Sequence, residues 1–251
     1  MKHFYNYLYL PQLILSLLIF SGISCSKENN NLAPKNNTGA GGSLNMFTIT
    51  AGHLYIVEGS NLQVYDLKDP AKPVFKAKQK IGRDIETIFP YQDKLFIGSR
   101  DAMYIFSLTD PANPEQIGMV NHLRSCDPVV TQGNTAYVTL RSGAACGGNL
   151  NILVVYDISN IQQPVQKQRI NFAHPYGLGI KENALYVCDG SAGLHILDIS
   201  EPLTPKADSV INDTFYDVIP YGDVLICYLE KGIALYDIST PLKPVLLSNI
   251  K

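Results

Sequence analysis

The chain has 251 residues, a formal net charge of −2 at neutral pH and a hydrophobic fraction of 46%. Because the net charge is close to zero and no basic cluster is present, we expect no nucleic-acid partner. The composition includes 15 tyrosines and no tryptophan, so tyrosine is the main source of amphipathic surface.

Residues 1–25 have the layout of an export signal. Lys2 and His3 precede an apolar run from Leu13 to Phe20, which is too short to cross a bilayer comfortably. Small residues then lead to Cys25. The segment resembles a bacterial lipoprotein signal, in which that cysteine becomes the lipidated first residue of the mature protein. The alternative is an ordinary cleaved signal with an incidental cysteine.

Residues 26–44 are polar and rich in Asn and Gly, with too little apolar surface to offset the entropy of ordering. The composition predicts a flexible tether there, followed by one β domain at 45–251. The lipoprotein resemblance implies a place in the bacterial cell envelope, lipid-anchored in the outer membrane and facing the periplasm or the surface. The lipid anchor would then be the only membrane contact.

One sequence pattern occurs five times along the chain. Its copies are LQVYDLKDPAKPV (62–74), AMYIFSLTDPANPE (102–115), LVVYDISNIQQPV (153–165), LHILDISEPLTPK (194–206) and IALYDISTPLKPV (233–245). With Asp66 as the marker, successive copies are 41, 50, 41 and 39 residues apart. The loop RSGAACGGNLN, Arg141 to Asn151, accounts for the one long step.

Each copy belongs to a unit with four short runs that are apolar or alternating. In the second unit these runs are ETIFP, KLFIGS, AMYIFSL and EQIGMV. Such runs indicate strands, and four strands in about 40 residues are typical of a β-propeller blade. We therefore predict an all-β fold, a five-bladed β-propeller of four-stranded antiparallel blades, at about 45–81, 84–122, 126–171, 174–213 and 215–251. No overlapping closing strand is evident, so ring closure would depend on packing between the first and last blades.

The segments LHILDIS, LVVYDIS and IALYDIS resemble the LVIVD repeat family. This family is found in predicted surface and exported proteins of bacteria and archaea and is thought to form propellers. The resemblance covers all five repeats and is specific in three. It implies a fold and an exported setting, and it carries no established reaction.

Asp157, Asp198 and Asp237 recur once per blade, in the turn after the third strand. A row of carboxylates can suggest metal binding or acid catalysis, but residues that recur in every blade are spread around a ring. We interpret them as turn residues on the bottom face, where their side chains hold the backbone.

The opposite, top face carries the loops before the first strand and after the second strand of each blade. Polar residues there differ from blade to blade, as recognition of one asymmetric ligand requires. The candidate rim residues are Arg83, Asp84, Glu86, Arg100, Asp127, Arg141, His174, Tyr176, Asp189, Tyr216, Asp217 and Glu230. The alternative is an ordinary polar rim, in which Arg100 and Arg141 simply pair with Glu86 and Asp127.

Sequence motifs for catalysis are absent. A glycosidase needs two carboxyl groups about 5 to 10 Å apart. No glycosidase motif accompanies the rim carboxylates that could supply them: Glu86, Asp127, Asp189, Asp217 and Glu230. The histidines of the mature chain lack ligand spacing: His53, His122, His174 and His195. We expect no catalytic residues, no metal and no cofactor.

Four cysteines remain besides Cys25. Cys126 and Cys146 are predicted on the top face of the third blade, where a disulfide would close a loop of about 20 residues. Cys188 and Cys227 lie in second strands of neighbouring blades, one position out of register, and are predicted to be buried free thiols that point to opposite faces.

These observations favour an exported, lipid-anchored binding or scaffold module that acts through its top rim. The expected partner is an envelope protein or a glycan, and the expected state is a monomer. One alternative is a carbohydrate-active propeller enzyme that uses rim carboxylates, and another is a purely structural envelope protein.

Overall fold

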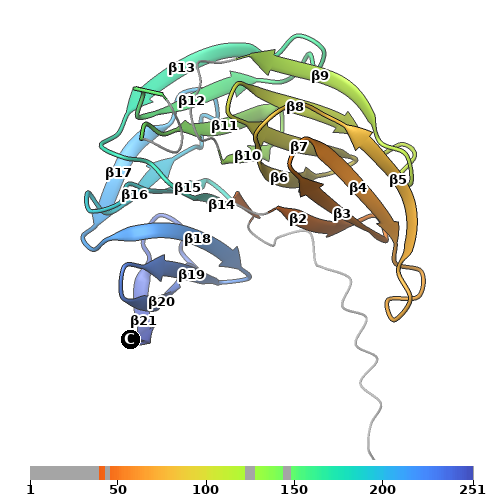
Figure 1. Ribbon diagram of the computed structural model, residues 1–251. Coiled ribbons are helices and arrows are strands. Elements are labelled where there is room, and N and C mark those ends of the chain that lie inside the picture. The colour runs from red at the N-terminus through yellow and green to blue at the C-terminus, as the bar shows by residue number, and fades with distance from the viewer. Residues whose placement is uncertain (1–39, 43–45, 122–127, 144–147, 251) are drawn as a thin grey trace, which may run out of the picture. The chain divides into compact units, whose positions relative to one another are not determined.

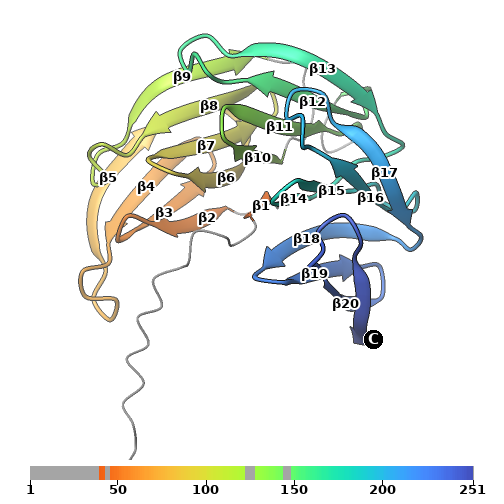
Figure 2. The same ribbon diagram turned by 180° about the vertical axis from the view of Figure 1, so that it is seen from behind.

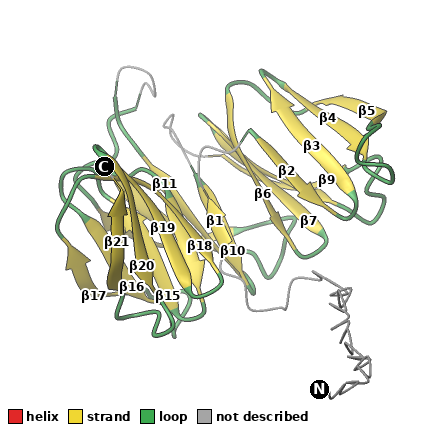
Figure 3. Ribbon diagram, turned by 90° about the horizontal axis from the view of Figure 1, so that it is seen from below, coloured by secondary structure: helices red, strands yellow, loops and turns green. Residues whose placement is uncertain are grey.

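The computed structural model describes residues 40–42, 46–121, 128–143 and 148–250. All of them belong to one compact unit, Pro34–Lys251. They form strands joined by turns and loops, and none of these residues lies in a helix (Figure 3). Within this described part of the chain, no helix is available to cross a membrane.

Five antiparallel sheets, here called blades one to five, follow one another along the chain (Figure 1). Blade one consists of β2 (Phe47–Thr50), β3 (His53–Glu58), β4 (Asn61–Asp66) and β5 (Val74–Lys80). Blade two consists of β6 (Ile85–Tyr91), β7 (Lys94–Ser99), β8 (Ala102–Ser107) and β9 (Glu115–Asn121). Blade three consists of β10 (Val129–Gln132), β11 (Thr135–Leu140), β12 (Ile152–Asp157) and β13 (Val165–Asn171). Blade four consists of β14 (Leu178–Lys181), β15 (Ala184–Cys188), β16 (Leu194–Asp198) and β17 (Lys206–Ile211). Blade five consists of β18 (Phe215–Tyr221), β19 (Val224–Leu229), β20 (Gly232–Asp237) and β21 (Val245–Ile250).

The prediction of an all-β, five-bladed β-propeller is confirmed. Each predicted repeat yields one four-stranded sheet, because its short apolar runs alternate with turn residues. The hairpins between first and second strands need a left-handed residue, which is Gly133 in blade three and Gly222 in blade five. Gln92 and Glu182 take the same conformation in blades two and four.

A short strand at the N-terminal end of the described chain joins blade four. Strand β1 (Ala40–Gly42) pairs antiparallel with β14, Ala40 opposite Ile180 (Figure 2). It also contacts the inner strands β18, β10 and β6, so it lies at the centre of the blades. These residues fall within the predicted tether, and the expectation of a flexible segment is wrong for residues 40–42. Ala-Gly-Gly has no apolar alternation, so its pairing with β14 determines its strand conformation.

Neighbouring blades pack through their inner strands: β2 on β6, β6 on β10, β10 on β14 and β14 on β18. Within the described residues, no strand of blade one packs on blade five in this way. On the outward faces of these two blades, Phe47 and Ile49 are 60% and 63% exposed, and Ile219 is 44% exposed. Each terminal blade therefore buries one apolar face and leaves much of the other accessible.

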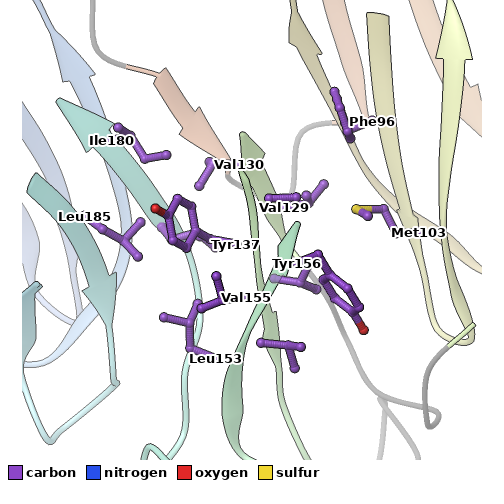
Figure 4. Packing of buried hydrophobic residues seen from close by; sticks show 14 of the residues in the cluster. Phe96, Met103, Val129, Val130, Tyr137, Leu153, Val155, Tyr156, Ile180 and Leu185 are labelled. Atoms are coloured by element: carbon purple, nitrogen blue, oxygen red, sulfur yellow. The ribbon is translucent and has the colours of Figure 1, made fainter. Parts of the chain in front are cut away.

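The core consists of apolar side chains between neighbouring blades. Figure 4 shows Tyr137 of β11 close to Ile180 of β14, and Tyr156 of β12 on the side of Met103 of β8. All four side chains are buried. Burial of one such side chain stabilises the folded state by about 1.5 to 3 kcal/mol, so the interfaces between blades are the main source of stability.

A hydroxyl–carbonyl hydrogen bond repeats at three of the junctions between blades. A tyrosine in the second strand donates to the carbonyl oxygen of a turn proline in the next blade: Tyr55 to Pro111 at 2.8 Å, Tyr137 to Pro202 at 2.8 Å and Tyr186 to Pro241 at 2.6 Å. From blade two to blade three, the corresponding residues are Phe96 and Ile161. Both the hydroxyl donor and the proline are therefore absent at this junction. At the other three junctions, the hydrogen bond links the turn of one blade to the preceding blade.

The recurring aspartates hold the turns after the third strands. Each carboxylate accepts a hydrogen bond from the backbone N–H two residues later, at 2.7 to 3.0 Å, in Asp66, Asp157, Asp198 and Asp237. Ser107 does the same in blade two with the N–H of Thr109. The structural interpretation of this row is confirmed. Hydrogen bonds from that second residue are the largest cause of a lowered pKa at each of the four carboxyl groups.

Candidate functional site

The rim residues of blade two form a group that neutralises itself. The Arg100 Nε atom donates a hydrogen bond to Oε1 of Glu86 at 3.0 Å, and its terminal nitrogen lies 3.9 Å from Oδ2 of Asp84. Arg83 lines a small cavity together with Asp84 and Arg100. The predicted pairing of Arg100 with Glu86 is therefore confirmed. Because the guanidinium already has carboxylate partners, this group is better suited to fixing the rim than to holding a ligand.

Asp189, at the end of β15, also serves the scaffold. Its carboxylate is 2% exposed and accepts hydrogen bonds from the backbone N–H groups of Ala173 and His174. His195 Nε2 lies 3.4 Å from it. Burial alone would raise the pKa of Asp189, but the nearby His195 ring and the hydrogen bonds from the two N–H groups bring it below the ordinary value. The side chain thus fixes the loop that enters blade four.

His174 stands in that loop and connects blades three and four. Its Nε2 lies 3.0 Å from the carbonyl oxygen of Ser142, and its ring packs edge-on against Tyr176 with centroids 4.9 Å apart. Both contacts position neighbouring residues. His174 therefore supports the ring of Tyr176 by packing against it.

A cavity of about 280 Å³ lies on the top face, at the meeting of blades three, four and five. Its walls are Pro128, Arg141, Tyr176, Gly177, Tyr216, Asp217 and Tyr228. We call it the tyrosine pocket. Four of the predicted rim residues come together here: Arg141, Tyr176, Tyr216 and Asp217.

Arg141 has the most unusual environment in the tyrosine pocket. Its guanidinium carbon lies 4.2 Å from the ring centroid of Tyr176, over the ring. Its Nε atom is buried and has no hydrogen-bond partner among the described residues. Its predicted partner Asp127 falls outside the described residues.

The backbone groups of Tyr176 and Gly177 together make hydrogen bonds to three blades. Its N–H donates to the carbonyl of Cys188 at 2.7 Å, and its carbonyl accepts a hydrogen bond from the Thr139 hydroxyl at 2.9 Å. The next residue, Gly177, donates to the carbonyl of Tyr216 at 3.0 Å. A Cβ atom on Gly177 would collide with Oδ1 of Asp217, so this close approach of blades four and five requires glycine.

Two more tyrosines extend the aromatic wall into blade five. The ring of Tyr216 meets that of Tyr176 edge-on at 5.0 Å, and Tyr228 lies 6.0 Å from Tyr216. Desolvation, and then the charge of Glu230, raise the pKa of Tyr216, so its hydroxyl stays protonated at neutral pH. Asp217 accepts a hydrogen bond from the N–H of Val218 at 2.9 Å. The pocket therefore combines a cation, a carboxylate and three aromatic rings.

Two of the rim carboxylates considered for glycosidase chemistry have other tasks, because Glu86 pairs with Arg100 and Asp189 holds backbone N–H groups. Among the described residues, no three His, Cys, Asp or Glu side chains come together as a metal site would need.

Sequence reasoning missed Tyr228, Pro128 and Gly177. Tyr228 lies near the end of the second strand of blade five, where Cys188 stands in blade four and is buried. A tyrosine in place of a small buried residue was the available signal. The predicted disulfide cysteines Cys126 and Cys146, and the predicted lipidation site Cys25, lie outside the described residues.

The other two cysteines are buried and free, as predicted. Cys188 faces blade five and Cys227 faces blade four, so both enter the same apolar cluster between these blades. The two side chains point to opposite faces of their sheets, as their register predicts, and these two faces pack against each other in one interface. Burial raises the pKa of both thiols, that of Cys227 to about 12.

A wider cavity of about 700 Å³ opens on the bottom face between blades three and four. Turn residues such as Asp157, Ser159 and Ser200 line it. Their polar groups hydrogen-bond one another, since Asp157 accepts from the Ser159 N–H and Asp198 from the Ser200 N–H. This cavity is a consequence of the repeated turns and carries no blade-specific cluster of charge.

Sequence comparison connects this geometry to a repeat family. Residues 177–209, which cover most of blade four, match the model of the LVIVD repeat. The chain thus contains an LVIVD repeat in blade four. The matched segment begins at Gly177 of the tyrosine pocket, so the repeat supplies part of the wall. No curated protein matches the chain.

The chain resembles several solved structures in fold. A functionally unknown protein from Desulfotomaculum acetoxidans superposes with a TM-score of 0.65 at 13% identity, over 82% of this chain and 68% of that one. The computationally designed protein Ika8 gives 0.60 at 10% identity, over 81% and 60%. BamB from Moraxella catarrhalis gives 0.57 at 11% identity, over 77% and 58%. The chain thus spans less than two thirds of Ika8 and of BamB, and the likeness shows the fold alone.

Proposed function

We propose that this protein is a binding module that recognises its partner through the tyrosine pocket. The observation that carries the proposal is the buried Arg141 Nε atom, which lacks a hydrogen-bond partner among the described residues. A buried polar group without a partner is costly, and a bound ligand that supplies an acceptor would remove that cost. Elsewhere on the rim, Arg100 already has its carboxylates.

The position of the pocket supports the same function. It is built by three different blades, and the tyrosines at equivalent places in blades four and five, Tyr176 and Tyr216, have no counterpart in blades one to three. A single asymmetric partner needs such a place in a repetitive scaffold. Tyrosine and arginine are also the residue types that most often dominate binding energy at interfaces.

We further propose that the protein works in the bacterial cell envelope, lipid-anchored at Cys25 and monomeric, with an envelope protein or a glycan as its partner. The apolar run before Cys25 and the polar segment after it support export and tethering. The LVIVD repeat agrees with an exported setting.

Capture from an envelope extract tests the binding proposal. The full-length chain should retain a defined partner, and the double variant Arg141→Ala/Tyr216→Ala should lose at least about 90% of it, since a loss of about 1.4 kcal/mol already weakens binding tenfold. The matched control is Arg169→Ala/Tyr65→Ala, which removes an arginine from β13 and a tyrosine from β4, both far along the chain from the pocket.

Both variants must keep the melting temperature of the wild type for the comparison to count as a binding result. Equal capture by the wild type and by the pocket variant, with both folded, would overturn the proposal. Loss with the control as well would also contradict it, because the binding surface would then not be the tyrosine pocket.

A further inference from the structure

The chemistry of the tyrosine pocket narrows its ligand class. We infer that the pocket binds a single carboxylate carried close to a flat apolar group, such as an aromatic ring. This inference rests on the proposed binding function and goes beyond it, because it names the chemical group that Arg141 and the tyrosines would recognise.

The carboxylate follows from Arg141. A guanidinium donates hydrogen bonds in its own plane, so contact of its face with the Tyr176 ring leaves its edge available. The Nε donor has no partner among the described residues. A carboxylate matches this fork with two parallel hydrogen bonds and is the ordinary partner of an arginine edge.

The flat apolar group follows from the walls. Tyr176, Tyr216 and Tyr228 form a continuous series of ring contacts at 5.0 and 6.0 Å, and Pro128 adds a buried apolar surface. Tyrosine rings prefer edge or offset contacts with another ring. Binding of such a rigid group costs little conformational entropy, because few torsion angles become fixed. A sugar or a long flexible chain would gain less from such walls.

Size and charge limit the ligand further. The volume of about 280 Å³ is that of roughly nine waters at about 30 Å³ each, which suits one ring with its acid group. The Asp217 carboxylate lines the same cavity, and Glu230 acts on Tyr216 from close by. Repulsion by these two carboxylates grows with the charge of the ligand, so it disfavours a dianion such as phosphate more than a monoanion.

Two sources can present this chemistry: a free aromatic acid, or the terminal carboxylate of a peptide that ends in an aromatic residue. Ligand-observed NMR with the full-length chain separates them. The probes are phenylacetate, phenylacetamide and phenylphosphonate for the small acid, and N-acetylphenylalanine with its amide for the peptide terminus.

We expect at least one carboxylate probe to bind, with its amide and the phosphonate at least about tenfold weaker. Arg141→Gln should abolish this preference, and the control Arg169→Gln should keep it. A preference for phenylacetate identifies a free acid as the source, and a preference for N-acetylphenylalanine identifies a peptide terminus.

Equal binding of acid and amide, or binding of neither carboxylate to the folded wild type, would overturn the inference. The capture experiment then tests the proposed function separately. If capture still depends on Arg141 and Tyr216, the pocket binds a partner of other chemistry and only the ligand class is wrong. If capture does not depend on them, both proposals fail.

Discussion

The Tyr186 hydroxyl group, on strand β15 of blade four, donates a hydrogen bond of 2.6 Å to the carbonyl oxygen of Pro241 in blade five. The tyrosine side chain is fully buried. This bond fastens the turn of the last blade to its neighbour. Blade five packs on blade four, and among the described residues none of its strands packs on blade one as neighbouring blades do.

Tyr186→Phe should therefore lower the free energy of unfolding by about 1 to 3 kcal/mol, since a buried carbonyl loses its donor. Urea unfolding followed by circular dichroism measures this difference. The matched control is Tyr65→Phe, whose hydroxyl bonds the side chain of Gln63 on the outward face of blade one. The control should change stability by less than about 0.5 kcal/mol. Equal losses for the two variants would contradict a special role for the bond to Pro241.

The four turn aspartates predict a loss of stability in acid. Hydrogen bonds lower the pKa of Asp66, Asp157, Asp198 and Asp237 in the folded chain, so folding favours their ionised form. Their contribution is complete above the unfolded pKa of about 4 and disappears as the pH falls through the lower folded values.

The variant with all four residues changed to Asn should lose less unfolding free energy than the wild type between about pH 5 and about pH 2. Asparagine keeps an oxygen acceptor for the turn and does not titrate. The exposed residue Asp208 on β17 provides the control, since Asp208→Asn should leave the acid loss unchanged. An identical acid loss in wild type and quadruple variant would show that other groups cause it.

The buried thiols should be inert in the native protein. Burial raises the pKa of Cys188 and Cys227, so neither forms a reactive thiolate at pH 8, and neither is accessible. Iodoacetamide should label both only after unfolding. Mass mapping of a non-reduced digest from the same samples tests the predicted bond between Cys126 and Cys146. Rapid labelling of Cys188 in the folded chain, or recovery of Cys126 and Cys146 as free thiols, would refute the respective prediction.

Lipid attachment at Cys25 predicts a clear cellular phenotype. Metabolic labelling with a fatty acid should mark the wild-type chain, and Cys25→Ser should remove the label. The variant should also leave the membrane fraction, because an acyl chain contributes about 0.8 kcal/mol of membrane affinity per buried CH₂ group. The control Cys188→Ser should keep the label. Equal labelling of wild type and Cys25→Ser would rule out this anchor.

The fold could be predicted from the sequence because the strand and turn patterns are local and recur in each repeat. Runs such as KLFIGS and AMYIFSL are short and apolar, as buried strands are, and a turn that begins with Asp or Ser follows each third strand. Strand β1 could not be predicted, since Ala40–Gly42 carries no pattern of its own and becomes a strand only by pairing with β14. The packing of Cys188 and Cys227 in one interface likewise depends on how two sheets face each other.

The candidate site was predictable only in part. Arg141, Tyr176, Tyr216 and Asp217 could be assigned to the top face because strand direction fixes which loops share it. Which of the rim residues meet depends on distances between blades. The sequence does not contain these distances. It therefore could not show that Arg100 pairs with Glu86 while Arg141 lies over an aromatic ring, or that Tyr228 lines the pocket.

The unpaired terminal blades have a consequence for how the molecule opens. Blades two, three and four are packed on both sides, whereas blades one and five have a single neighbour each within the described residues. In a row of nearest-neighbour interfaces, end units fray first. Backbone amides of β2 to β5 and β18 to β21 should therefore exchange with solvent deuterium sooner than those of β10 to β13. Blade five forms one wall of the tyrosine pocket, so a ligand bound there would slow the exchange of the very blade that is easiest to open.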